Sequence, residues 1–154
     1  VGEVNATTLM HEKGAIIGGE GNGGVIYPAI HSGRDAMVGV ALFLSNLAHK
    51  KMTVSELKKT YPEYHIAKNK IELSDKGLID KILSELKVIY AHENVNDIDG
   101  VKISFEDKRE WVHLRKSNTE PIIRIYSEAP TEEEAVKLSE KVIAVAEKII
   151  SSAK

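Results

Sequence analysis

Residues 115–121, with the sequence Arg-Lys-Ser-Asn-Thr-Glu-Pro, concentrate the groups that bind a phosphate dianion. An arginine offers a planar fork to two oxygens, a lysine adds a point charge, and Ser and Thr hydroxyls donate hydrogen bonds. A tight loop can also direct several backbone N–H groups at one anion. Arg124 follows on the face opposite Ile123 and Ile125, from which it can point back toward this loop. The alternative is a solvated hairpin loop, because Ser, Asn and Thr are common turn residues.

Residues 18–24, with the sequence Gly-Gly-Glu-Gly-Asn-Gly-Gly, form a second candidate loop. The carboxylate of Glu20 can accept hydrogen bonds from two adjacent hydroxyls of a sugar, and the glycines permit positive φ and remove steric bulk. The alternative is a flexible connection between strands. The loop is not a dinucleotide fingerprint, because it leads into an expected strand rather than a helix.

Composition excludes several classes of function. The chain has 154 residues, and its 21 Lys and Arg against 23 Asp and Glu argue against a general nucleic-acid binder. The absence of cysteine excludes disulfides, thiolate catalysis and Cys-ligated zinc. No metal-ligand spacing is found among His11, His49, His65, His92 and His113. No apolar run approaches the roughly 20 residues of a membrane span, so no membrane partner and a cytoplasmic location are expected.

The first part of the chain is expected to be an incomplete α/β domain over residues 1–60. Its expected elements are a helix at 3–12, a buried strand at 15–17 and a strand at 25–27. Ser32 and Asp35 have capping-box spacing for a helix that is apolar on nearly every face from 36 to 48, which predicts deep burial. Asp35 is also explained simply as a helix cap. So few elements cannot cover such a helix, and part of the domain is expected upstream of Val1.

The polar stretch 58–70 predicts the boundary of a second domain, residues 61–154. Strands are expected at 64–73, 101–105, 111–114 and 122–126, a turn at 96–100, and helices after Ser74 and Thr131. Because consecutive strands are joined by short loops, the pattern favours a mainly antiparallel four-stranded sheet covered by two helices. The fold class predicted for the whole chain is therefore α+β.

Residues 115–129, with the sequence RKSNTEPIIRIYSEA, resemble the phosphate-binding loop of the α-D-phosphohexomutase superfamily. This family includes phosphoglucomutases, phosphomannomutases and phosphoglucosamine mutases. The resemblance, with the spacing, implies phosphate contacts by Arg115, Lys116 (in a supporting role), Ser117, Asn118, Thr119 and Arg124. Asn118, in place of glycine, is closer to the phosphoglucomutase and phosphomannomutase branch.

The glycine-rich loop resembles the family's Gly-Glu-x-Ser-Gly-His sugar loop, with Asn22 and Gly24 standing where serine and histidine are common. The resemblance implies sugar contacts by Glu20, Asn22 and Gly23. Arg34 near a helix start is read as a surface salt bridge, with anion binding as the alternative. His31 is read either as a ligand contact or as a structural histidine.

The resemblance covers the end of the family's third domain and the whole of its fourth. It implies that the intact enzyme interconverts hexose 1-phosphate and hexose 6-phosphate, of glucose or mannose, through an upstream phosphoserine, with Mg²⁺ and a hexose 1,6-bisphosphate activator. The sequence has neither a Ser-His-Asn-Pro segment nor an Asp-Gly-Asp-x-Asp run, so these 154 residues alone are expected to bind no metal and to be inactive.

The implied partners are hexose phosphates and the upstream domains of the same enzyme. The alternative is a stand-alone, non-catalytic domain for anion binding or protein interaction. A third interpretation, RNA contact through Arg115 and Lys116, is opposed by the lack of a wider basic and aromatic surface.

Overall fold

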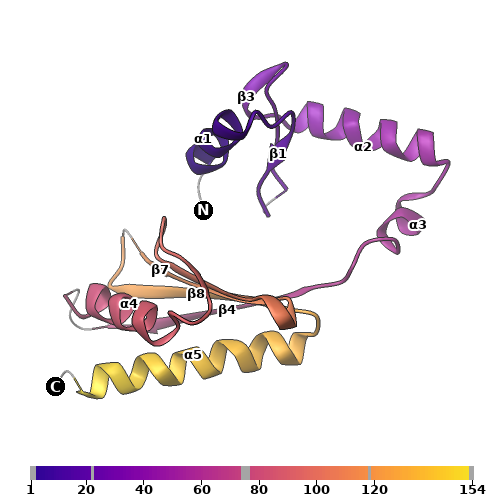
Figure 1. Cartoon of the computed structure of the whole chain (residues 1–154). Coiled ribbons are helices and arrows are strands. Elements are labelled where there is room, and N and C mark those ends of the chain that lie inside the picture. The colour runs from indigo at the N-terminus through magenta and orange to yellow at the C-terminus, as the bar shows by residue number, and fades with distance from the viewer. Residues whose placement is uncertain (1–2, 22, 74–76, 118, 153–154) are drawn as a thin grey trace. The chain divides into compact units, whose positions relative to one another are not determined.

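The computed structural model describes residues 3–21, 23–73, 77–117 and 119–152. The chain divides into two compact units, Val1–Pro62 and Glu63–Lys154, which are described separately below (Figure 1). Within the described residues, no helix combines the length and the apolar composition needed to cross a membrane.

The first unit is a small antiparallel sheet, in the order β1-β2-β3, with three helices. Its elements are α1 (Glu3–Lys13), β1 (Gly18–Gly19), β2 (Val25–Tyr27), β3 (His31–Arg34), α2 (Ala36–Lys50) and α3 (Val54–Lys58). The helix expected at 3–12 and the strand expected at 25–27 are confirmed. The buried strand expected at 15–17 is wrong, and Ile16 is 79% exposed. Pairing with the short β2 starts only at Gly18, so the apolar run before it has no partner strand.

The N-terminus of α2 differs from the predicted capping box. Asp35 is itself the N-cap, in extended conformation, and its carboxylate accepts a hydrogen bond of 3.0 Å from the backbone N–H of Val38. Ser32 lies in β3, which pairs with β2, so the chain there is still extended and cannot begin the helix. The capping role of Asp35 is thus confirmed, whereas the helix start at Ser32 is wrong.

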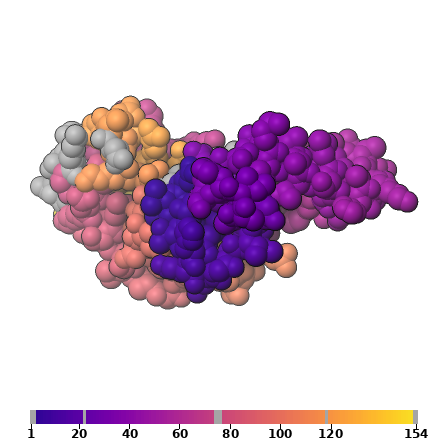
Figure 2. Space-filling model, turned by 90° about the horizontal axis from the view of Figure 1, so that it is seen from above, coloured from indigo at the N-terminus to yellow at the C-terminus, as the bar shows by residue number. Residues whose placement is uncertain are grey.

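The deep burial predicted for residues 36–48 is also wrong for the described chain, in which no residue of α2 is buried. Met37 and Leu44 are 77% and 57% exposed. Figure 2 draws the surface of this helix in purple. The reason is geometric: α2 packs against β2, where Gly39 approaches the side chain of Val25, and three short strands cannot surround a helix of 15 residues.

The second unit is a five-stranded, fully antiparallel sheet in the order β4-β8-β7-β6-β5. Its elements are β4 (His65–Glu72), α4 (Gly77–Ile89), β5 (Asn94–Asn96), β6 (Val101–Phe105), a 3₁₀ turn (Glu106–Lys108), β7 (Glu110–Lys116), β8 (Ile122–Ala129) and α5 (Glu132–Ser152). The α+β class and the antiparallel sheet are confirmed, but the sheet has five strands rather than four. The missed strand, β5, is a short, polar edge strand without readable alternation.

The helices α4 and α5 lie on the same side of this sheet, as Figure 1 shows, and share one hydrophobic core with it. Its fully buried large side chains include Ile79, Ile82 and Leu86 of α4, Val142 of α5, and Ile103, Leu114, Ile123 and Ile125 of the strands. Burial alternates along β8, where Ile123 and Ile125 face the helices and Arg124 is exposed. The second face of the sheet carries Arg124 and is not covered by α4 or α5, and we call it the open face.

Replacing a core residue of this sheet should unfold the second unit more easily. Ile125→Ala should lower the free energy of unfolding by about 2–5 kcal/mol, because it removes buried methyl groups and leaves a cavity. The control Ile98→Ala, at a side chain that is 75% exposed, should change it by less than about 0.5 kcal/mol. Urea denaturation followed by tryptophan fluorescence measures both, and equal losses would contradict this description of the core.

Candidate functional site

The loop that joins β7 to β8 is held by its own backbone and by Ser117. The N–H of Ser117 donates to the carbonyl of Ile122 at 3.0 Å, and the N–H of Ile122 donates to the carbonyl of Glu120 at 2.9 Å. The Ser117 hydroxyl accepts from the Glu120 N–H at 3.3 Å and lies 3.5 Å from the Thr119 hydroxyl. Ser117 is nearly buried, so its hydroxyl shapes the loop. Asn118 lies outside the described residues.

Three cations lie side by side across the open face next to this loop. In the register of the sheet, Arg115 of β7 is opposite Arg124 of β8, and Arg124 is opposite Lys70 of β4. Like charges directly opposite each other destabilise a sheet, so packing alone does not favour this row. A row of cations beside a loop with hydroxyl and N–H donors is suited to a small dianion. The sequence alone did not identify Lys70 as a site residue, because only the pairing of β4 with β8 brings it into this row.

Each cation of the row has a carboxylate partner. Arg124 Nη2 is 3.5 Å from Glu120 Oε2, and Lys70 Nζ is 2.6 Å from Glu72 Oε1. The hydrogen bond between Lys70 and Glu72 raises the pKa of the lysine and lowers the pKa of the glutamate. Both pairs are largely exposed, so they contribute little to stability and an anion can displace them. An open hollow of about 580 Å³ lies here, lined by residues that include Lys68, Lys70, Glu120, Arg124 and Tyr126.

Lys116 is not brought together with Arg115 and Arg124. Its Nζ lies 3.2 Å from both carboxylate oxygens of Asp80, which belongs to α4 on the helix-covered side of the sheet. Successive residues of a strand point to opposite faces, so Arg115 and Lys116 diverge at the end of β7. A supporting role of Lys116 in phosphate binding stays a prediction, and it requires release of Asp80.

The glycine-rich loop of the first unit is the turn between β1 and β2. The N–H of Glu20 donates to the carbonyl of Gly24, and the N–H of Gly23 donates to the carbonyl of Glu20, both at 3.0 Å. Gly23 has a φ of +87°, which confirms that this loop uses glycine for a left-handed backbone. The turn thus presents Glu20, which is half-buried, at the end of a hairpin. Asn22 lies outside the described residues.

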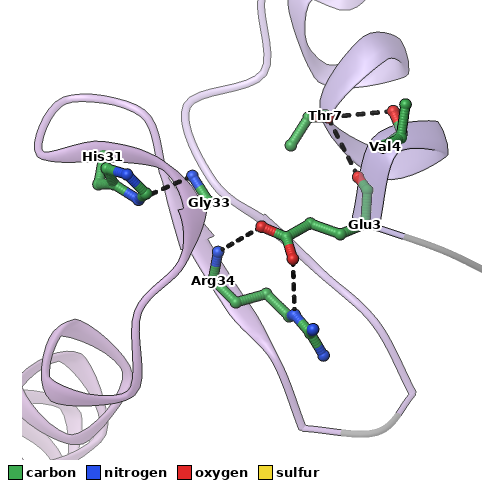
Figure 3. A network of polar contacts seen from close by, with 6 residues as sticks. All are labelled: Glu3, Val4, Thr7, His31, Gly33 and Arg34. Atoms are coloured by element: carbon green, nitrogen blue, oxygen red, sulfur yellow. Dashed lines mark hydrogen bonds and ion pairs between the residues drawn. The ribbon is translucent and has the colours of Figure 1, made fainter.

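Figure 3 shows that Arg34 and His31 make structural contacts. Glu3 Oε1 accepts from the backbone N–H of Arg34 at 2.9 Å, and Arg34 Nε lies 3.0 Å from Glu3 Oε2. These contacts, the backbone hydrogen bond first, lower the pKa of Glu3. The N–H of Gly33 donates to His31 Nδ1 at 2.9 Å. The reading of Arg34 as a salt-bridge residue is confirmed. Over the described ranges, no three His, Cys, Asp or Glu side chains are grouped to hold a metal ion.

Comparison with known proteins identifies the family to which both units of the chain are similar. The family model for the phosphoglucomutase/phosphomannomutase C-terminal domain matches residues 68–145, and the model for alpha/beta/alpha domain III matches residues 1–64. The chain therefore belongs to the phosphoglucomutase/phosphomannomutase family, within the α-D-phosphohexomutase superfamily.

Relatives with different names align with the chain. A phosphoglucomutase/phosphomannomutase of Thermococcus kodakarensis is 39% identical over 88% of this chain and 29% of its own length. A phosphoglucosamine/phosphogalactosamine mutase of Sulfurisphaera tokodaii is 36% identical over 90% of this chain and 30% of its own. The solved structure of a phosphoglucomutase/phosphomannomutase family protein from Burkholderia thailandensis is 23% identical and shares the fold, with a TM-score of 0.69. The match covers 96% of this chain and 32% of the other chain. The chain thus spans about a third of these relatives.

Protonation of His113 should make the fold less stable at mildly acidic pH. His113 lies on the open face of β7 and is 8% exposed; burial lowers its pKa, and the hydrogen bond with the Asp99 carbonyl offsets part of this effect. The unfolded chain, with a histidine pKa of about 6.5, then binds the proton more tightly than the folded chain. The free energy of unfolding should therefore fall as the pH drops below about 6.5, until the folded-state pKa is passed.

Chemical denaturation between about pH 7.5 and pH 5.5 checks this linkage. His113→Gln should lose less stability over this range than the unsubstituted chain. His92→Gln is the control, because the His92 side chain is 70% exposed, and it should behave like the unsubstituted chain. Equal pH dependence in all three proteins would contradict the assignment to His113.

Proposed function

We propose that the chain supplies the phosphate-binding loop and a sugar-binding loop of a phosphohexomutase that interconverts hexose 1-phosphate and hexose 6-phosphate. The phosphate contacts are Arg115, Ser117, Asn118, Thr119 and Arg124, with Lys70 as an addition and Lys116 in a supporting role; the sugar contacts are Glu20, Asn22 and Gly23. The observation that carries the proposal is the row of Arg115, Arg124 and Lys70 beside the β7–β8 loop. Membership of the family supports it.

The whole protein's reaction is also a proposal, since the chain spans about a third of its relatives. We expect the phosphoserine, the Mg²⁺ ligands and the binding of a hexose 1,6-bisphosphate activator to belong to other parts of that protein. The described residues of this chain offer no ligand cluster for a metal, so no step through a metal is assigned to them. The apolar side chains exposed on α2 are suited to cover by those other parts. A cytoplasmic location stays a prediction.

The identity of the sugar has two candidates. Glucose or mannose phosphates are favoured by Asn118 in the loop motif, and the Thermococcus relative carries the matching name. Hexosamine phosphates are favoured by the name of the Sulfurisphaera relative. Comparing kcat/KM of the full-length enzyme for glucose 1-phosphate, mannose 1-phosphate and glucosamine 1-phosphate separates them. A dominant value for glucosamine 1-phosphate would overturn the first candidate.

Truncating Arg115 should weaken phosphate binding by this chain. In a ¹H–¹⁵N NMR titration with glucose 1-phosphate up to about 50 mM, we expect shifts around residues 115–119, Arg124 and Lys70. Arg115→Ala should weaken the affinity about 10- to 100-fold, because a charge-assisted hydrogen bond to the phosphate is lost. In the full-length enzyme the same substitution should raise KM and lower kcat/KM.

Arg34→Ala is the matched control, because Arg34 is also paired with a carboxylate but belongs to the first unit. It should leave the affinity for glucose 1-phosphate unchanged. If no signal near residues 115–119 moves in the unsubstituted chain, the proposal fails and the stand-alone interaction domain becomes the better interpretation.

A further inference from the structure

Arg115 differs from the other two cations of the row in how it is held. Its Nε lies 3.1 Å from Oδ1 and 3.0 Å from Oδ2 of Asp99, in the turn between β5 and β6. These side chains are 33% and 27% exposed, whereas Lys70 and Glu72 are 60% and 72% exposed. Both contacts use Nε, so Asp99 leaves the end-on pair of amino groups of the planar guanidinium unused. That pair matches the spacing of two phosphate oxygens.

The turn that carries Asp99 is itself fastened to β7. Gly100 has a φ of +82°, and a Cβ there would overlap the carbonyl of Leu114 and lie 3.1 Å from Cα of Arg115. On the open face, His113 Nε2 lies 2.5 Å from the carbonyl oxygen of Asp99, which can only accept, so the imidazole donates. The backbone that follows the Asp99 side chain therefore lies close against the strand that carries Arg115.

Two opposite effects of Asp99 on anion binding have to be compared. Its negative charge repels a phosphate, but it lies on the Nε side of the guanidinium, away from the amino groups, and solvent screens a partly exposed charge. The contacts of Asp99 also hold the Arg115 side chain, which would otherwise lose considerable rotamer freedom on binding a ligand. Because screening weakens the repulsion but not the positioning of the side chain, we expect the net effect of Asp99 to be tighter binding.

We propose that Asp99 is a positioning residue, which holds the guanidinium of Arg115 so that its amino groups face a phosphate bound at the β7–β8 loop. This inference rests on the proposed function, because it presupposes that Arg115 binds the phosphate. Asp99 acts through Arg115 and does not touch the ligand. No feature of the sequence near the loop points to it, since it is 16 residues away along the chain.

The test compares four variants of the full 154-residue chain, titrated with glucose 1-phosphate and with inorganic phosphate as probes. Asp99→Ala should weaken the affinity about three- to tenfold, the usual effect of having to order one long side chain on binding. Asp99→Asn, whose amide oxygen still accepts from Nε, should recover part of this loss. Arg115→Ala should weaken the affinity about 10- to 100-fold, and adding Asp99→Ala to it should change nothing further, because the two residues act as one unit.

The ¹⁵N signal of Arg115 Nε–H reports the positioning directly. It should be a distinct, slowly exchanging signal in the unsubstituted chain and lose that protection in Asp99→Ala. Asp97→Asn is the control, because Asp97 lies in the same turn but pairs with Lys87 of α4, and it should leave the signal and the affinity unchanged.

The outcomes separate this inference from the proposed function. Unchanged or tighter binding by Asp99→Ala, with weaker binding by Arg115→Ala, would overturn the positioning role and leave the phosphate site intact. Binding unaffected by Arg115→Ala would overturn the proposed function itself. A further loss on adding Asp99→Ala to Arg115→Ala would show that Asp99 acts through the fold of the turn, and would also overturn the inference.

Discussion

The structure of the second unit depends on the register in which β4, β8 and β7 pair. One face of this sheet is buried under α4 and α5, so a slip of one residue would expose Ile123 and Ile125 and bury Arg124. The hydrophobic core therefore holds the register, and the register in turn places Arg115, Arg124 and Lys70 in one row. The stability of the fold and the charge of the candidate site follow from the same pairing.

The row of cations is compatible with a stable sheet, because each cation is paired with a carboxylate. These pairs differ in how exposed they are and in how firmly the carboxylate is held. Glu72 and Glu120 are exposed partners that an anion can replace at little cost. Asp99 is different, because Gly100 and His113 fasten its turn to β7. The edge of the sheet formed by β5 and β6 thereby supports the site, although its residues carry none of the motif.

The first unit contains one feature that is complete by itself and one that is not. Its hairpin loop is closed by local hydrogen bonds around Glu20 and Gly23, so this feature is complete without other elements. The helix α2 is not, because its apolar side chains remain exposed in the described chain. A strongly apolar segment predicts that something covers it, but the sequence of the segment does not contain the covering surface.

The sequence by itself determined the features that depend on neighbouring residues. The cap at Asp35, the helices after Ser74 and Thr131, the strands at 101–105, 111–114 and 122–126, and the motif that places the chain in its family were all readable. Only the tertiary structure decided that Ser32 lies in a strand and that β5 joins the sheet. It also decided that Lys70 lies beside Arg124, that Asp99 lies beside Arg115, and that Lys116 turns toward α4. Caps and periodicity are local, whereas strand register and turn contacts join residues far apart in the chain, and no local pattern encodes them.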